Sequence, residues 1–191
     1  MTAARAICSG SIPVTDDEAD CSDIAVCPSK PEWSRLRRVT ARLISQHRMA
    51  ETLIFRASLS PKVFRAFEIA DTSSLYELAQ AIVLFFDFDF DHAFGFYNKL
   101  KGNIYASPVR YELFVDMGES ESEALSVKRT HVIEAFPAVG RKMRFLFDYG
   151  DGWEFLVELV KRKPTEPKVK LPRLLISAGE APSQYPDPED D

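Results

Sequence analysis

Cysteine is scarce in this sequence, as are the features that mark secreted or membrane proteins. Its 191 residues hold only Cys8, Cys21 and Cys27. An odd number of cysteines at one end provides no disulfide framework, so we expect a cytoplasmic location. The start lacks the apolar core of a signal peptide, and the apolar run at 81–86 falls far below the roughly 20 residues that cross a membrane.

Familiar catalytic signatures are missing too. The sequence contains no G-x-S-x-G elbow, no phosphate-binding Gly-rich loop, no H-E-x-x-H motif and no dinucleotide fingerprint. The net charge of −5 argues against a protein that binds nucleic acid over its whole surface. Whether the chain is an enzyme therefore stays open.

Aromatic residues are plentiful, with 14 Phe and six Tyr. They predict an aromatic core, and the chain length predicts one domain of about 100–200 residues with attached tails. Charge and composition divide the chain into four parts: a disordered acidic leader (1–29), a basic helix (30–49), a folded α+β body (50–176) and an acidic, Pro-rich tail (177–191).

The basic helix offers the candidate residues for binding nucleic acid. They are four arginines that would contact phosphates: Arg35, Arg37, Arg38 and Arg42. A second basic block, at 161–173, holds six cations, one Glu and three prolines. Both blocks have a plainer interpretation as solvated faces, and the helix can instead pair with the acidic leader.

The body begins with two predicted strands, at 52–59 and 63–70, followed by a helix. Ser74 and Glu77 form a capping box, and apolar residues recur behind it at helical spacing as far as Phe86. Further strands are predicted at 92–97, 111–115 and in a hairpin over 140–162. We therefore expect an α+β domain with a mixed or mainly antiparallel sheet, one long helix packed on it and short helices besides.

Alternating Asp and Phe residues lead into the third strand. Asp87, Asp89, Asp91 and His92 could converge on a divalent metal, because carboxylates and imidazole are metal ligands. The alternating aspartates equally suit a solvated turn, and no Gly or late Glu completes a calcium loop. We expect His92 at an inward-facing strand position.

The hairpin turn carries the most specific pattern, D-Y-G-D-G-W. Asp148, Asp151 and Glu154 place three carboxylates near the turn. One hypothesis brings them to His92 as a metal-assisted hydrolase or small-ligand site. The alternative is structural, with aspartates bonded to turn amides and Trp153 packed.

The segment FLFDYGDGWEFLVEL resembles the signature of a family named after the third open reading frame of a root-inducing plasmid, also described as the TnpR-type passenger of an insertion element. Supporting similarities occur in DHAFGFY and in LPRLLISAGEAPSQYP. The residues that carry the resemblance, and hence our candidate ligand site, are Asp91, His92, Phe94, Asp148, Tyr149, Gly150, Asp151, Gly152 and Trp153.

The resemblance covers roughly residues 50–186 and implies an α+β domain associated with bacterial or archaeal mobile elements. It implies no reaction and no cofactor. Tyr76 and Glu77 stand where the family helix often carries His, and YPDPEDD replaces a Cys-containing ending, so no role of those family residues transfers.

Two functions follow from these observations. The first is a non-enzymatic accessory module that contacts nucleic acid or a protein partner. The second is the hydrolase or ligand-binding site of His92, Asp148, Asp151 and Glu154. A divalent metal belongs only to the second function.

Overall fold

The computed structural model describes residues 50–118 and 123–185. The predicted acidic leader and basic helix lie outside these residues, as do the nucleic-acid candidates Arg35, Arg37, Arg38 and Arg42. Within the described ranges, no helix is long and apolar enough to cross a membrane.

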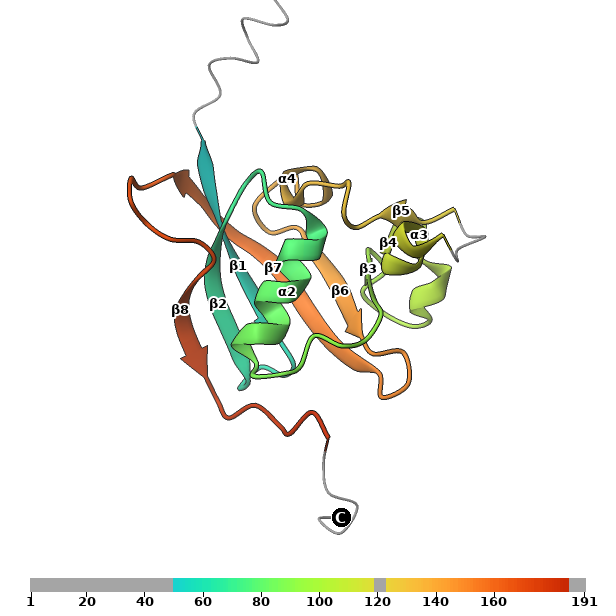
Figure 1. The fold of residues 1–191 in the computed structure, drawn as a ribbon. Helices are drawn as coiled ribbons and strands as arrows, with labels where there is room; N and C mark the ends of the chain where they lie inside the picture. The colour runs from blue at the N-terminus through green and yellow to red at the C-terminus, as the bar shows by residue number, and fades with distance from the viewer. Residues whose placement is uncertain (1–49, 119–122, 186–191) are drawn as a thin grey trace, which may run out of the picture. The chain divides into compact units, whose positions relative to one another are not determined.

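A single mixed sheet of eight strands dominates this part of the chain, in the order β5-β4-β3-β6-β7-β1-β2-β8 (Figure 1). Every described strand pair is antiparallel except β4–β5. The strands are β1 (Glu51–Ser58), β2 (Phe64–Ala70), β3 (Phe94–Tyr97), β4 (Arg110–Glu112), β5 (Leu125–Ser126), β6 (Lys142–Phe147), β7 (Trp153–Pro164) and β8 (Arg173–Ala178).

The helix α2 (Leu75–Phe85) starts where the capping box predicts. The Ser74 hydroxyl accepts from the Glu77 backbone N–H, and the Glu77 carboxylate accepts from the Ser74 N–H at 2.7 Å. Two backbone donors of the first turn are thereby satisfied. The helix ends before Asp87, whose φ of 61° is left-handed and incompatible with a further turn.

The expectation of one long helix packed on a sheet is wrong. The helix α2 has only 11 residues, and α3 (Leu113–Met117) and α4 (Val132–Ala135) have five and four. The large eight-stranded sheet, rather than a helix, sets the architecture, which stays broadly α+β. The 3-10 turn η1 (Ile104–Ala106) completes the described helical elements.

Two local predictions also fail. The predicted strand at 111–115 is a strand only through Glu112, after which the chain turns into α3. The sequence predicts no strand at the position of β8, yet β8 pairs with β2 at the sheet edge. At β8, pairing with a distant strand thus decides the structure where the local pattern gives no signal.

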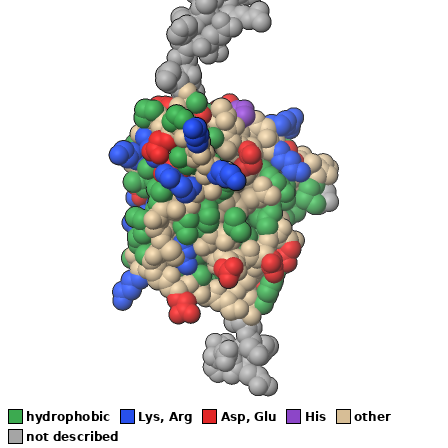
Figure 2. Space-filling model, turned by 60° about the vertical axis from the view of Figure 1, so that its left-hand side comes forward, with side chains coloured by type: hydrophobic (Ala, Val, Ile, Leu, Met, Phe, Trp, Pro, Cys, Tyr) green, Lys and Arg blue, Asp and Glu red, His purple; other side chains and the backbone are tan. Residues whose placement is uncertain are grey.

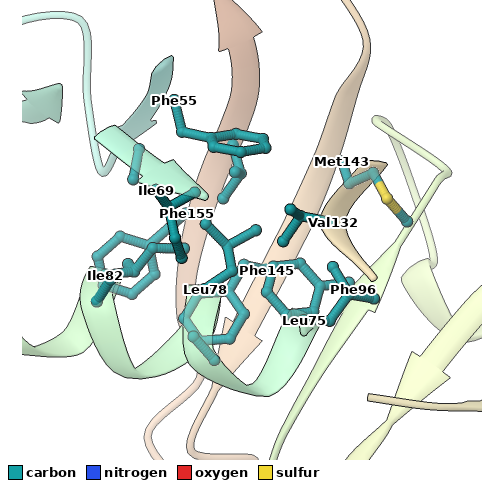
Figure 3. Close-up of a cluster of buried hydrophobic side chains, with 14 of the residues drawn as sticks. Phe55, Ile69, Leu75, Leu78, Ile82, Phe96, Val132, Met143, Phe145 and Phe155 are labelled. Atoms are coloured by element: carbon teal, nitrogen blue, oxygen red, sulfur yellow. The ribbon is translucent and has the colours of Figure 1, made fainter. Parts of the chain in front are cut away.

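The core lies between α2 and one face of the sheet, as Figure 3 shows. Leu78 and Ile82 of the helix meet Phe145 and Phe155 of the central strands, and all four are essentially buried. Ring contacts link these strands, with Phe145 and Phe155 centroids 5.6 Å apart. Many of the aromatic residues that are plentiful in the sequence therefore pack in this core layer.

Charged residues occupy the open part of the opposite face of the sheet, whereas η1 and a small buried apolar cluster cover the rest. Lys142 pairs with Glu158 at 3.2 Å and Arg144 pairs with Glu154, in both cases across β6 and β7. Such cross-strand pairs suit the part of this face that no helix covers.

Candidate functional site

The D-Y-G-D-G-W turn joins β6 to β7, as the hairpin prediction requires. Asp148 adopts a φ of 57°, and its Oδ1 accepts the Gly150 N–H at 2.8 Å and the Asp151 N–H at 3.4 Å. The Gly152 N–H donates to the Asp148 carbonyl at 2.8 Å, and Gly152 itself has a φ of 72°. One carboxylate oxygen of Asp148 therefore shapes the turn.

The other carboxylate oxygen of Asp148 approaches His92. Its Oδ2 lies 3.6 Å from His92 Nε2, and His92 Nδ1 lies 2.7 Å from Asp91 Oδ1. The imidazole thus sits between two carboxylates from distant parts of the chain. The expectation of an inward-facing strand position for His92 is wrong: it precedes β3, and 40% of its side chain is exposed.

The charges of this cluster favour a cationic imidazole. The hydrogen bond that His92 Nδ1 makes with Asp91 raises the pKa of His92 above 6.5, helped by the charges of Asp148 and Asp151. The hydrogen bond from Tyr185 lowers the pKa of Asp91 below 3.8. The three carboxylates outnumber the single imidazole, so the site carries excess negative charge in either protonation state of His92.

The C-terminal segment reaches the cluster through two side chains. The Tyr185 hydroxyl donates to Asp91 Oδ2 at 2.8 Å, which raises the Tyr185 pKa to about 12. Gln184 accepts from the Asp89 N–H at 2.6 Å and donates to the Asp89 carbonyl at 3.3 Å and to Asp91 Oδ1 at 3.4 Å. This pairing joins residues 93 to 95 positions apart in sequence.

A cavity of about 560 Å³ adjoins the cluster. Asp89, Gln184 and Tyr185 line it, and the same Gln184 and Tyr185 contact Asp91 beside His92. Arg65, Asp87 and Glu180 line it as well. Its volume falls within the range of small-molecule sites.

Other signature residues support the fold. Phe94 is fully buried, and Trp153 packs on Phe88 with ring centroids 4.9 Å apart. The Tyr149 hydroxyl bonds to that of Tyr97 at 2.9 Å. Gly95 makes room for this pair, since a Cβ there would lie 2.9 Å from both hydroxyls.

The structure does not bring Glu154 to His92. Glu154 projects from the uncovered face of the sheet, where it pairs with Arg144. Among the described residues, no group of three or more His, Cys, Asp and Glu is arranged to hold a metal ion. Asp87 and Asp89 line the cavity rather than converging with Asp91 on one point.

Half of the second basic block is neutralised within the domain. Arg162 pairs with Glu51, while Lys163 and Arg173 both pair with Glu68, at 3.0 and 2.7 Å. The other three cations, which make no ion pair in the described part of the chain, are Lys161, Lys168 and Lys170.

Sequence reasoning missed three residues of the site: Arg65, Gln184 and Tyr185. The strand pattern of β2 makes Arg65 look like an interruption of a buried strand. Gln184 and Tyr185 fall in a stretch that composition assigns to a tail. No local signal identifies either contact, because each depends on chain segments that are distant in sequence.

The sheet with α2 on one face is shared with a solved structure. A protein of unknown function from Methanosarcina mazei Go1, MM3350, matches with a TM-score of 0.55 and 18% identity, over 70% of this chain and 72% of that one. At this identity the match shows the fold alone. Comparison with curated proteins gives no match.

Residues 54–187 match the family model of the plasmid pRiA4b ORF-3-like proteins. This range covers both the sheet and the D-Y-G-D-G-W turn. The chain belongs to the plasmid pRiA4b ORF-3-like family.

Proposed function

We propose that this domain is a non-enzymatic binding module for a small charged molecule, with its site at the His92 cluster and the adjoining cavity. The single observation that carries the proposal is the position of His92. Its half-exposed imidazole lies between Asp91 and Asp148. Gln184 and Tyr185, which bond to Asp91, line a cavity of about 560 Å³. Convergent polar groups beside a cavity of this size are typical of ligand sites.

The exposure of the cluster supports binding over a purely structural role. Asp148 has a structural task through its bonds to the turn amides, and Asp91 has one through its bonds to the C-terminal segment, whereas His92 has no such task among the described residues. Asp91 and His92 have side chains 49% and 40% exposed, so solvent and solutes reach them. Charged groups that are accessible and perturbed in pKa are candidates for function.

Ligand-observed NMR with a panel of charged metabolites tests this proposal. We expect at least one compound to show saturation transfer with the wild type and to lose it with His92→Gln. His131→Gln is the matched control, because His131 is exposed and Nδ1-bonded to the Thr72 carbonyl. Compounds that bind the wild type and His92→Gln equally, or no binding at all, would contradict the proposal.

Nucleic-acid binding is the second candidate. Figure 2 shows Lys and Arg side chains gathered in the upper part of one face, and Lys161, Lys168 and Lys170 make no ion pair among the described residues. Free cations of this kind bind phosphates in a salt-dependent manner. The arginines of the basic helix would add to them.

Fluorescence anisotropy with labelled DNA and RNA at two salt concentrations tests this candidate. We expect binding to weaken steeply with salt and to fall when the three lysines are changed to Gln together. A second variant with Arg35, Arg37, Arg38 and Arg42 changed to Gln measures the share of the basic helix. Salt-independent binding, or none, would exclude the nucleic-acid role.

The cytoplasmic location, the association with bacterial or archaeal mobile elements and the TnpR-type passenger role belong to this proposal as well. They are supported by the family and by the cysteine content of the sequence. A reducing compartment would keep Cys8, Cys21 and Cys27 as thiols.

A further inference from the structure

Arg65 is a buried cation without a counter-ion. It lies on β2 with 6% of its surface exposed and makes no ion pair in the described part of the chain. Its Nε donates to the Phe85 carbonyl at 2.9 Å, and its Nη1 donates to the carbonyls of Phe64 at 3.0 Å, Ala178 at 3.0 Å and Gly179 at 3.1 Å. Backbone carbonyls therefore solvate a charge whose burial is otherwise unfavourable.

One nitrogen of the guanidinium takes no part in these bonds. All four hydrogen bonds of Arg65 start from Nε and Nη1, so within the described residues Nη2 has no acceptor. Nη2 is also not one of the fully enclosed unpartnered atoms. Arg65 lines the cavity, and Nη2 is the guanidinium nitrogen whose two N–H groups are not used by the described residues.

The rest of the lining carries the opposite charge. Asp87, Asp89 and Glu180 line the same cavity with exposed side chains, and none lies within ion-pair distance of Arg65. One cation and three carboxylates give the lining a formal charge of −2. A simple anion would be repelled by the carboxylates, and a simple cation would leave Nη2 unpaired.

We infer that the cavity binds an amino acid with a cationic side chain, such as L-arginine or L-lysine. Its α-carboxylate accepts hydrogen bonds from Arg65 Nη2, and its cationic groups lie against Asp87, Asp89 and Glu180. Guanidinium–carboxylate pairing supplies the specificity for the carboxylate. The inference rests on the proposed function, because it names the ligand class of the cavity beside His92.

Calorimetric titration of the full chain with three related compounds tests both contacts. L-arginine carries both groups, agmatine lacks the α-carboxylate, and L-citrulline has a neutral side chain. We expect L-arginine to bind about tenfold or more tightly than either analogue, since a hydrogen bond to a charged group is worth that much. Equal affinity for agmatine overturns the Arg65 contact. No binding of L-arginine or L-lysine at about 10 mM overturns the whole inference.

Protein variants test the carboxylates separately. Asp87→Asn with Asp89→Asn should weaken L-arginine binding about tenfold. Asn tolerates the left-handed backbone of Asp87, so the fold is expected to survive. The control is Glu158→Gln on the uncovered face of the sheet, which should leave affinity unchanged. Arg65 is probed through the ligand because its substitution would also remove the bonds that hold α2 and β8. Unchanged affinity in the double variant contradicts the inference.

His92→Gln distinguishes this inference from the proposed function. If other charged compounds bind through His92 while L-arginine and L-lysine do not bind, only the ligand class is wrong. If L-arginine binding depends on Asp87 and Asp89 but not on His92, the ligand class stands and the role of the His92 cluster is wrong.

Discussion

The domain has two polar clusters of opposite character, one around Glu68 and the other around His92. The Glu68 side chain is 3% exposed and accepts from Lys163 at 3.0 Å and from Arg173 at 2.7 Å. Burial raises its pKa, but the bonds from Arg173 and Lys163 outweigh burial and leave the pKa below 4.5. The His92 side chain is 40% exposed. Two carboxylates, those of Asp91 and Asp148, lie against this one imidazole, so negative charge is in excess.

The difference separates a structural cluster from a candidate binding site. In the Glu68 cluster, two cations are balanced by Glu68 and by Glu166, which pairs with Lys163 at 2.8 Å. The carboxylate of Glu68 is buried, so a ligand could make little contact with it. The His92 cluster has unbalanced charge, solvent access and a neighbouring cavity. A positively charged ligand is therefore attracted more strongly to the His92 cluster than to the Glu68 cluster.

The largest expected effect is on the enclosed cluster. Glu68→Gln should lower the free energy of unfolding by about 2 kcal/mol, because it leaves Lys163 and Arg173 without their shared carboxylate. Urea denaturation measures this loss. The control Glu158→Gln removes a surface pair and should cost less than about 1 kcal/mol. Equal losses of unfolding free energy in the two variants would show that the burial of Glu68 does not make its ion pairs stronger than the surface pair of Glu158.

Asp148 should show an intermediate effect that depends on the replacement. Asp148→Ala loses the acceptor of the turn amides and forces Ala into the left-handed region, so we expect the free energy of unfolding to fall by about 1.5 kcal/mol. Asp148→Asn keeps an acceptor and tolerates that backbone, and should cost less than about 1 kcal/mol. Thermal unfolding of the two variants measures the difference. An Asp148→Ala variant as stable as the wild type would contradict the role of Asp148 in the turn.

His92 should respond in titration more than in stability. Its folded-state pKa is raised, so its stabilising contribution is present below pH about 6.5 and is lost as pH rises through the raised value. NMR titration of the ring should show a pKa above 6.5, and Asp91→Asn should lower it. A pKa of His92 that is unchanged in Asp91→Asn would contradict the arrangement.

The smallest expected effect concerns Tyr185. Tyr185→Phe should change the free energy of unfolding by less than about 0.5 kcal/mol near neutral pH. It should raise the pKa of Asp91 toward 3.8, because the hydroxyl hydrogen bond is the main cause of the lowered value. The contribution of Asp91 to stability, present above about pH 3.8, would then be lost at a higher pH on acidification. Carboxyl NMR titration checks this shift.

Local hydrogen bonding explains which elements were predicted well. The capping box at Ser74 and Glu77 and the D-Y-G-D-G-W hairpin depend on contacts within a few residues, so their patterns identify them. β8 lacked any such signal. Its apolar residues lie between a Pro-rich stretch and a Gly, and only pairing with β2 makes them a strand.

The candidate site was likewise predicted only in part. The motif pattern pointed to Asp91, His92 and Asp148, which the fold brings together. The same pattern grouped Glu154 with them, although strand alternation places Glu154 on the other face of the sheet. Adjacent positions in a turn therefore do not imply a shared site, because successive residues of a strand face opposite sides.

Three features can be read from the sequence alone: the capped helix, the hairpin with its Asp-Gly turn and the abundance of aromatic residues in the core. These depend on local backbone geometry and on hydrophobic periodicity. The assembled fold sets the strand order, the bond from Tyr185 to Asp91 across 94 positions and the bond from Arg65 to the Gly179 carbonyl across 114. Such contacts follow from how the whole sheet assembles, since the chain must close long loops before any of them forms.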